Sequence, residues 1–212
     1  GLRPLVANKT GSATTKLSRE HTVDRPAPGF VSMAGGKYTT YRVMAKDAVD
    51  LAVLDLRRLV SDSVTDKLPL IGADGYFALV QQTAQIAAEY GLDEKVVTHL
   101  LNRYGSMISE VLDLIVDDKK LAQPLAVGLP YLKAEIVYAV THEGAMTVDD
   151  VISRRTRLAF EAPNAGLGLV DNVAALIAPY LGWGAREKKA SIAEYTAQVE
   201  EEVKALSALI NS

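Results

Sequence analysis

A glycine pair followed by a lysine and two threonines is the stretch of this sequence best suited to binding a ligand. The octapeptide GGKYTTYR at 35–42 lies between an apolar run, FVSMA at 30–34, and a long amphipathic pattern. Glycine lacks a Cβ, so the backbone at Gly35 and Gly36 can turn sharply and lie close to a bulky ligand. The free N–H groups and positive dipole end of a following helix would point at such a turn. The stretch therefore favours an anionic or carbonyl-rich ligand, helped by Lys37, Thr39 and Thr40, although a plain turn is the commoner meaning of this spacing.

The composition is that of an ordinary globular protein. The chain has 212 residues, of which 49% are hydrophobic and 23% charged, enough for one domain with a sizeable core and a small appendage. The net charge of −3 gives no reason to expect nucleic acid as a partner. The absence of cysteine excludes disulfides, thiolate catalysis and cysteine-bound metals. No apolar run approaches the roughly 18–20 residues of a membrane span, and no signal peptide is recognisable, so a cytoplasmic setting is expected.

The hydrophobic pattern predicts a mainly α protein with a short extended segment at its start. Residues 17–23 are a candidate strand, and DRPAPG at 24–29 is expected to form the turn that ends it. Helical periodicity begins at Tyr38 and continues to about Val60. A polar stretch rich in glycine and proline then follows, so the chain is divided at residues 60 and 61.

Residues 61–212 are expected to form a bundle-like helical domain. The predicted helices span 76–90, 93–104, 106 or 109 to 116, 133–143, 147–160, 169–181 and 186–210. Asp93 is the predicted N-cap of the second of these helices, and Gly91 and Gly105 are predicted helix ends. The last helix carries a continuous apolar stripe made of Ile192, Tyr195, Val199, Val203, Leu206 and Ile210.

Three segments follow one another along the chain: GLRPL at 1–5, SREHT at 18–22 and the glycine-pair octapeptide at 35–42. Together they resemble the last part of the flavin domain in FAD-dependent glycerol-3-phosphate dehydrogenases. The runs YAVTHE, DDVISRRTRL and LGWGAREKKASIAEY resemble the helical C-terminal domain of the same enzymes. The resemblance implies that residues 1–60 are the C-terminal edge of an FAD-binding α/β domain and residues 61–212 the helical domain. Because the chain opens on glycine with mid-domain sequence, we expect it to be a piece of a longer protein.

The resemblance also implies which residues bind ligands. Arg3, Arg19 and Lys37 match positions that face the substrate phosphate, and guanidinium groups can grip a phosphate with two parallel hydrogen bonds. The flavin-side positions are implied to be Gly35, Gly36, Lys37, Thr39 and Thr40. The histidine that abstracts the proton in this family lies upstream of the matched portion, so no catalytic residue and no metal ligand is expected in this chain.

The implied activity is oxidation of sn-glycerol 3-phosphate to dihydroxyacetone phosphate, with hydride transfer to FAD. Electrons would then pass to quinone at the inner face of the cytoplasmic membrane, as a peripheral contact, or to oxygen. A homodimer is possible. The chain alone is expected to be inactive and to retain no FAD. Two alternatives remain open: a helical interaction or dimerisation domain without a ligand of its own, and an amine or hydroxy-acid oxidase of the same flavin fold.

The three histidines and one arginine cluster are weaker candidates for chemistry. His142 begins HEGAM, which fails the HExxH zinc pattern, and a polar stripe of Glu135, Tyr138 and His142 or a solvated surface accounts for it better. His99 is expected to be structural, whereas strand alternation places His21 beside Arg19 as a possible cavity residue. Asp150 and Arg154 are expected to pair on a helix surface, in a cluster that also holds Arg155 and Arg157. The run GLGLVD at 166–171 imitates a dinucleotide fingerprint but lacks its third glycine and a preceding strand.

Overall fold

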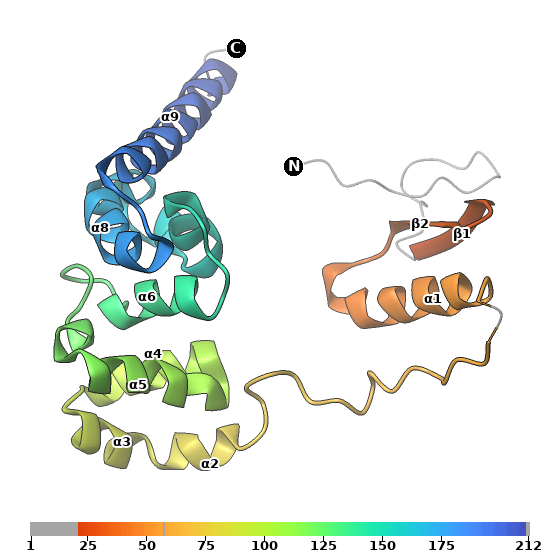
Figure 1. Ribbon diagram of the computed structural model, residues 1–212, viewed down its shortest axis with the longest axis horizontal. Coiled ribbons are helices and arrows are strands. Elements are labelled where there is room, and N and C mark those ends of the chain that lie inside the picture. The colour runs from red at the N-terminus through yellow and green to blue at the C-terminus, as the bar shows by residue number, and fades with distance from the viewer. Residues whose placement is uncertain (1–20, 57, 211–212) are drawn as a thin grey trace. The chain divides into compact units, whose positions relative to one another are not determined.

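The computed structural model describes residues 21–56 and 58–210 (Figure 1). The chain divides into two compact units, residues 1–69 and residues 70–212. The described part is mainly α-helical, as predicted, and its only sheet has two strands. None of its helices is long and apolar enough to cross a membrane.

The described part of the first unit contains a β-hairpin, a short 3-10 turn and one helix. Strand β1 (His21–Ala27) pairs antiparallel with β2 (Phe30–Gly35), and η2 (Tyr38–Thr40) leads into α1 (Tyr41–Val53). Helix α1 packs against both strands. No described residue of this unit is buried, because two strands and one helix cannot enclose a core.

The predicted turn at residues 24–29 was wrong in part. Strand β1 continues through Pro26 to Ala27, and only Pro28 and Gly29 form the turn. The strand tolerates Pro26 because the pairing register shifts between Asp24 and Ala27, so that no ladder bond is required from the missing N–H. The part of the predicted strand before His21 lies outside the described residues.

Helix α1 also ends earlier than the predicted Val60. The backbone N–H of Asp55 bonds the carbonyl of Ala52 at 3.3 Å, and that of Leu56 bonds Val53 at 3.0 Å. These tighter bonds, to the third residue back, close the last turn. An ion pair between Asp55 and Arg25 of β1 holds the chain at this point.

The second unit is built from helices. Its α-helices are α2 (Tyr76–Gln81), α3 (Thr83–Tyr90), α4 (Glu94–Tyr104), α5 (Ile108–Asp117), α6 (Lys133–Thr141), α7 (Leu158–Glu161), α8 (Val170–Leu181) and α9 (Ala185–Ile210). Between them lie the 3-10 segments η3 (Gly105–Met107), η4 (Lys119–Ala122) and η6 (Pro163–Leu169), and a π-helix, η5 (Asp150–Arg155). Figure 1 shows α2 to α5 at one end of this unit and α8 and α9 at the other.

Two predicted helices are each interrupted by a threonine. The helix predicted over 76–90 breaks at Gln82, where the Thr83 hydroxyl donates to the carbonyl of Val80 at 2.7 Å. The helix predicted over 147–160 becomes the π-helix and then ends at Thr156, which is extended. The N–H and hydroxyl of Thr156 both donate to the carbonyl of Val151, five residues earlier, at 2.9 and 2.7 Å. Threonine hydroxyls that bond backbone carbonyls in this way compete with regular helix bonds.

The predicted ends of α3 and α4 are confirmed. The Asp93 carboxylate accepts a hydrogen bond from the N–H of Lys95 at 2.8 Å and so caps α4. Gly91 ends α3 in the left-handed conformation, and Gly105 follows the last residue of α4.

Helix α6 separates two hydrophobic clusters. Ala134, Val137 and Tyr138 join the cluster formed with α3, α4 and α5. Ile136 and Ala139 join the cluster formed with α8 and α9. Because α6 is apolar on both sides, it is the buried helix around which the second unit is assembled.

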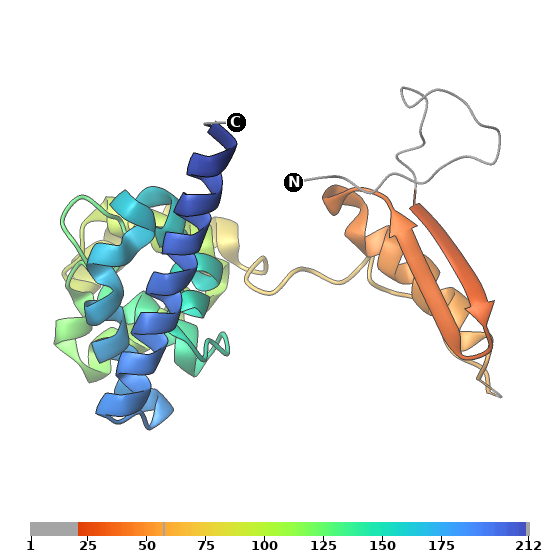
Figure 2. The ribbon, with the colours of Figure 1, turned by 90° about the horizontal axis from the view of Figure 1, so that it is seen from above.

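The apolar stripe predicted on α9 packs against the other helices of the second unit over only part of its length. Tyr195 and Val199 are 2% and 5% exposed, whereas Val203 and Leu206 are 56% and 59% exposed. Figure 2 shows the last turns of α9 running past the other helices of this unit. The Ile210 side chain lies outside the described ones.

Candidate functional site

The glycine pair forms the turn between β2 and the helical segment. Gly35 and Gly36 both have φ near 80°, in the left-handed region that favours glycine. A Cβ on Gly36 would lie 2.5 Å from the Met44 sulfur of α1 and 3.2 Å from the Cβ of His21. The turn is therefore fixed both by its backbone conformation and by close packing against β1 and α1.

A local hydrogen-bond pattern closes the turn after the glycines. The Thr40 hydroxyl donates to the carbonyl of Lys37 at 3.0 Å and accepts from its N–H at 3.2 Å. The Thr40 hydroxyl is therefore already occupied. The Thr39 side chain is exposed, and so is that of Lys37, which forms no ion pair with any described residue. No acidic residue lies in the first turn of η2 or of α1, so the positive end of the helix dipole is not neutralised there.

The predicted site residues are only partly placed. The described turn, residues 35–40, holds Gly35, Gly36, Lys37, Thr39 and Thr40, with Tyr38 between Lys37 and Thr39. The other two predicted phosphate-binding residues, Arg3 and Arg19, lie outside the described residues. The ligand-binding roles of all seven stay predictions.

His21 has a partner on the first helix. Its Nε2 lies 2.7 Å from a carboxylate oxygen of Asp47 in α1. This contact ties β1 to α1. A role for His21 in a substrate cavity stays a prediction.

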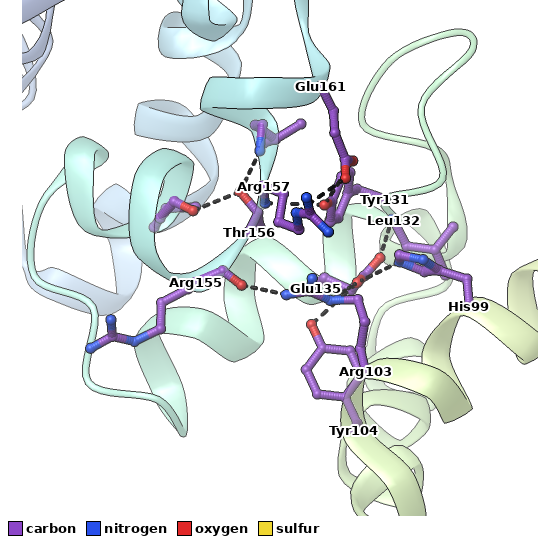
Figure 3. Close-up of polar contacts among 12 residues, drawn as sticks. His99, Arg103, Tyr104, Tyr131, Leu132, Glu135, Arg155, Thr156, Arg157 and Glu161 are labelled. Carbon is purple, nitrogen blue, oxygen red and sulfur yellow. Dashed lines mark hydrogen bonds and ion pairs between the residues drawn. The ribbon is translucent and has the colours of Figure 1, made fainter. Parts of the chain in front are cut away.

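A buried carboxylate, Glu135 of α6, organises the polar contacts of the second unit (Figure 3). Its side chain is fully buried. It accepts from the backbone N–H of Leu132 at 2.7 Å and from the Tyr104 hydroxyl at 3.2 Å, and lies 3.0 Å from Nε2 of His99. His99 is thus structural, as expected. The buried charge joins α4 to α6.

Arg103 extends this network to the π-helix. Its Nε lies 3.3 Å from the Glu135 carboxylate, and its Nη2 donates to the carbonyl of Arg155. Arg155 in turn donates from Nε to the carbonyl of Glu143 at 2.9 Å. The guanidinium of Arg103 also lies over the rings of Tyr104 and Tyr131, at 5.5 and 5.3 Å from their centroids. Figure 3 shows these groups converging between α4, α6 and the segment after the π-helix.

The predicted polar stripe of Glu135, Tyr138 and His142 was wrong. Glu135 faces α4, whereas the Tyr138 hydroxyl donates to Glu110 of α5 at 2.6 Å. The His142 ring stacks on the Tyr138 ring at 4.5 Å and makes no hydrogen bond to Glu135. Other helices surround α6, so residues that share one face of α6 contact different neighbouring helices.

The predicted pairing of Asp150 with Arg154 is confirmed at 3.0 Å. The other Asp150 oxygen accepts from the N–H groups of Met146 and Thr147, both at 3.1 Å. Burial raises the pKa of Asp150, but these N–H groups, the Thr147 side chain and Arg154 together lower it below the ordinary value.

Replacing Asp150 with asparagine should therefore lower the free energy of unfolding by about 1 kcal/mol at pH 7. Since the pKa is lower in the folded chain, the stability from Asp150 is present above its unfolded pKa and lost as the pH falls through the folded value. The difference between wild type and variant should shrink in urea titrations at pH 3. A difference that persists unchanged at that pH would contradict this assignment.

The run at 166–171 is not a phosphate-binding loop. Gly166 is buried in the 3-10 segment η6, and the element directly before this segment is helix α7 rather than a strand. Asn164 and Ala165 have φ of 52° and 53°, and the Tyr195 hydroxyl of α9 donates to the Ala165 carbonyl at 2.6 Å. The segment therefore packs α9 onto the core.

Known proteins resemble both units. The glycerol-3-phosphate dehydrogenase 2 of Mycobacterium tuberculosis is 49% identical over 203 residues, which cover 96% of this chain and 34% of that protein. The mitochondrial glycerol-3-phosphate dehydrogenase of Mus musculus is 35% identical over 193 residues, covering 89% and 26% of the two chains. The solved glycerol-3-phosphate dehydrogenase from Bacillus halodurans, complexed with FAD, matches 80% of this chain and 35% of its own, with 28% identity and a TM-score of 0.67.

This chain spans about a third of the length of the Mycobacterium tuberculosis enzyme and about a quarter of that of the Mus musculus enzyme. Residues 63–188, more than half of the chain, match the family described as the C-terminal domain of alpha-glycerophosphate oxidase. These matches confirm the resemblance drawn from the sequence motifs. The chain belongs to the alpha-glycerophosphate oxidase C-terminal domain family.

Proposed function

We propose that this chain is the C-terminal part of a flavoenzyme that oxidises sn-glycerol 3-phosphate to dihydroxyacetone phosphate. One observation carries the proposal. A left-handed glycine pair opens onto a helix without acidic residues in its first turn, in a chain whose relatives are named glycerol-3-phosphate dehydrogenases. A similar solved enzyme is complexed with FAD.

The residues of the turn fit the flavin of FAD. Gly35 and Gly36 present backbone without side chains, so a broad planar ring can approach closely. The N-terminus of α1 supplies positive potential toward a carbonyl-rich edge, and the exposed Thr39 hydroxyl is a further donor. When bound, FAD would accept the hydride from the secondary carbinol carbon of the substrate. Thr40 would act by shaping the turn, since its hydroxyl bonds Lys37.

Three cations would hold the substrate phosphate. Arg3 and Arg19 would each offer a guanidinium fork, and Lys37 an ammonium beside the glycine turn. The general base would come from the remainder of the enzyme. Replacing Arg3 or Lys37 with alanine in the full-length enzyme should lower kcat/KM for glycerol 3-phosphate by about 10- to 100-fold, the value of one charge-assisted hydrogen bond.

The measurement is dihydroxyacetone phosphate formation with an artificial electron acceptor, together with the flavin absorbance of each purified variant. The flavin band should be retained. Lys46→Ala on α1 is the matched control, because the Lys46 ammonium pairs with Asp50. Full turnover of both variants would remove Arg3 and Lys37 from the site. Turnover of another amine or hydroxy acid instead would favour a different oxidase of the same fold.

The electron acceptor and the location are proposed from the same resemblance. Electrons would pass to a quinone during a peripheral contact with the inner face of the cytoplasmic membrane, or to oxygen, and the enzyme would serve glycerol metabolism in the cytoplasm. Assays with a soluble quinone and with an oxygen electrode distinguish the two acceptors. Hydrogen peroxide formed in proportion to the product would favour oxygen.

The 212-residue chain by itself is proposed to bind no FAD. The first unit has no buried residue among those described, so its glycine turn lacks a supporting core. We expect the purified chain to show no flavin band at about 450 nm after incubation with FAD and desalting. A stoichiometric band would contradict the proposal.

A second candidate function is protein interaction or dimerisation through α9. The exposed Val203 and Leu206 on its last turns motivate it. Light scattering after size exclusion measures the mass directly. A dimer that Val203→Ser and Leu206→Ser dissociate, and that Lys37→Ala leaves intact, would support this role.

A further inference from the structure

The second unit contains a pocket that the flavin chemistry does not use. It has a volume of about 480 Å³ and lies between the end of α4, the start of α5 and the end of α6. Its lining residues are Ile71, Arg103, Tyr104, Met107, Glu110, Tyr138, His142 and Glu143. All of them belong to the same compact unit.

Two carboxylates of this pocket, Glu110 and Glu143, form no ion pair with a described residue. Glu110 accepts a hydrogen bond from the Tyr138 hydroxyl, and one Glu143 oxygen is buried without any hydrogen-bond partner. Burial raises the pKa of Glu143, although the charges of Arg103 and Arg155 oppose this.

The arginine that lines the pocket faces another carboxylate, although its Nε is buried without a hydrogen-bond partner. Arg103 lies against the fully buried Glu135 carboxylate at 3.3 Å and donates to the Arg155 carbonyl. Its positive charge is therefore balanced on the inner side. The carboxylates of Glu110 and Glu143 are therefore the groups available to bind a cationic ligand.

The remaining wall is aromatic and apolar. The Tyr104 and Tyr138 rings meet edge to face at 5.1 Å, and the Tyr138 and His142 rings stack at 4.5 Å. Met107 and Ile71 complete the lining. Such a surface suits the methylene stem of a long basic side chain, whose charged end prefers carboxylates.

We propose that this pocket binds an alkylguanidinium or alkylammonium group, with the cation between Glu110 and Glu143 and its methylene stem along Tyr138 and Met107. The cation can belong to a small amine or to a basic side chain of a partner protein. The chemistry is the same in both cases, so the experiment separates the two sources.

The test is isothermal titration of the 212-residue chain with agmatine. Glu110→Gln and Glu143→Gln should each weaken binding roughly tenfold, the value of one charge-assisted contact, and the double variant should bind no agmatine at millimolar concentration. Glutamine keeps the size of each side chain and can still accept from Tyr138. Asp113→Asn on α5, an exposed carboxylate outside the lining, is the matched control and should bind as wild type does.

A second titration uses the blocked peptide acetyl-Ala-Arg-Ala-amide. Tighter binding of this peptide than of agmatine supports a protein side chain as the guest, and the reverse supports a small amine. Absence of agmatine binding to the wild type, equal affinity of the wild type and both glutamine variants, or preference for inorganic phosphate over agmatine would each overturn the proposal. Circular dichroism of every variant confirms that the helices are intact.

Discussion

Replacing Glu135 with alanine is expected to lower the free energy of unfolding of the helical unit by about 3–5 kcal/mol. The substitution leaves the part-buried guanidinium of Arg103 without its carboxylate. It also removes the acceptor for the Leu132 N–H and the Tyr104 hydroxyl. Urea unfolding of the chain, followed by far-ultraviolet circular dichroism, measures the change.

Two further variants make this prediction specific. Glu89→Ala on α3 removes an exposed glutamate and should change stability by less than about 0.5 kcal/mol. Leu132 and Tyr104 donate to different oxygens of Glu135, so Glu135→Gln keeps an acceptor for only one of them and removes the charge facing Arg103. Its effect should be intermediate. If Glu135→Ala behaves like Glu89→Ala, the carboxylate does not hold α4 and α6 together.

The tertiary partners of Glu135 could not be predicted from local sequence. Helical spacing placed Glu135, Tyr138 and His142 on one face, and the predicted hydrogen-bonded stripe followed from that spacing alone. The structure surrounds α6, so Glu135 meets His99 and Tyr104, more than 30 residues away in sequence. Sequence periodicity reports which residues share a face, but not which helix covers it.

Local chemistry, in contrast, predicted several helix ends. Asp93 caps α4 through its own carboxylate, and Gly91 closes α3 in a conformation that glycine favours. These outcomes depend on residues one or two positions apart, which the sequence displays directly.

Gly105 ends a helix and also makes a long-range contact that its local sequence does not indicate. It was predicted as a helix end, and it is one, but its backbone also meets that of Gly72. The N–H of Ser106 donates to the Gly72 carbonyl at 2.8 Å, and a Cβ on Gly105 would lie 2.7 Å from the Gly72 carbonyl carbon. The absence of a side chain is required there for packing as well as for conformation.

The candidate site was predictable only as a local motif. The glycine pair and the following turn occur where the sequence placed them, and α1 follows them, although it spans Tyr41–Val53 rather than reaching Val60. Each of these features depends on neighbouring residues. The engagement of Thr40 with Lys37 and the packing of Gly36 on Met44 required the folded hairpin. The convergence of Arg3 and Arg19 on this turn is a prediction that rests on the family resemblance.

Gly36→Ala in the full-length enzyme is expected to abolish or greatly reduce flavin retention. Alanine at φ near 80° costs about 1–2 kcal/mol, and its Cβ would also overlap the Met44 sulfur. The Met44 side chain can move aside, but the Cβ would still lie 3.2 Å from the Cβ of His21 and the backbone strain would remain, so we expect the turn to shift. The flavin would then lose the close backbone approach that we propose. The ratio of flavin to protein absorbance in the purified variant measures retention.

Gly29→Ala is the matched control, because Gly29 has a similar φ of 73° but a Cβ there meets no atom within 4 Å. Both variants carry the same kind of backbone strain, and only Gly36→Ala changes the turn before α1. The flavin-to-protein ratio of these two full-length variants is the most direct test of the glycine turn as a flavin site. We predict a ratio near that of wild type for Gly29→Ala and a ratio near zero for Gly36→Ala. Equal flavin content in the two would contradict the account.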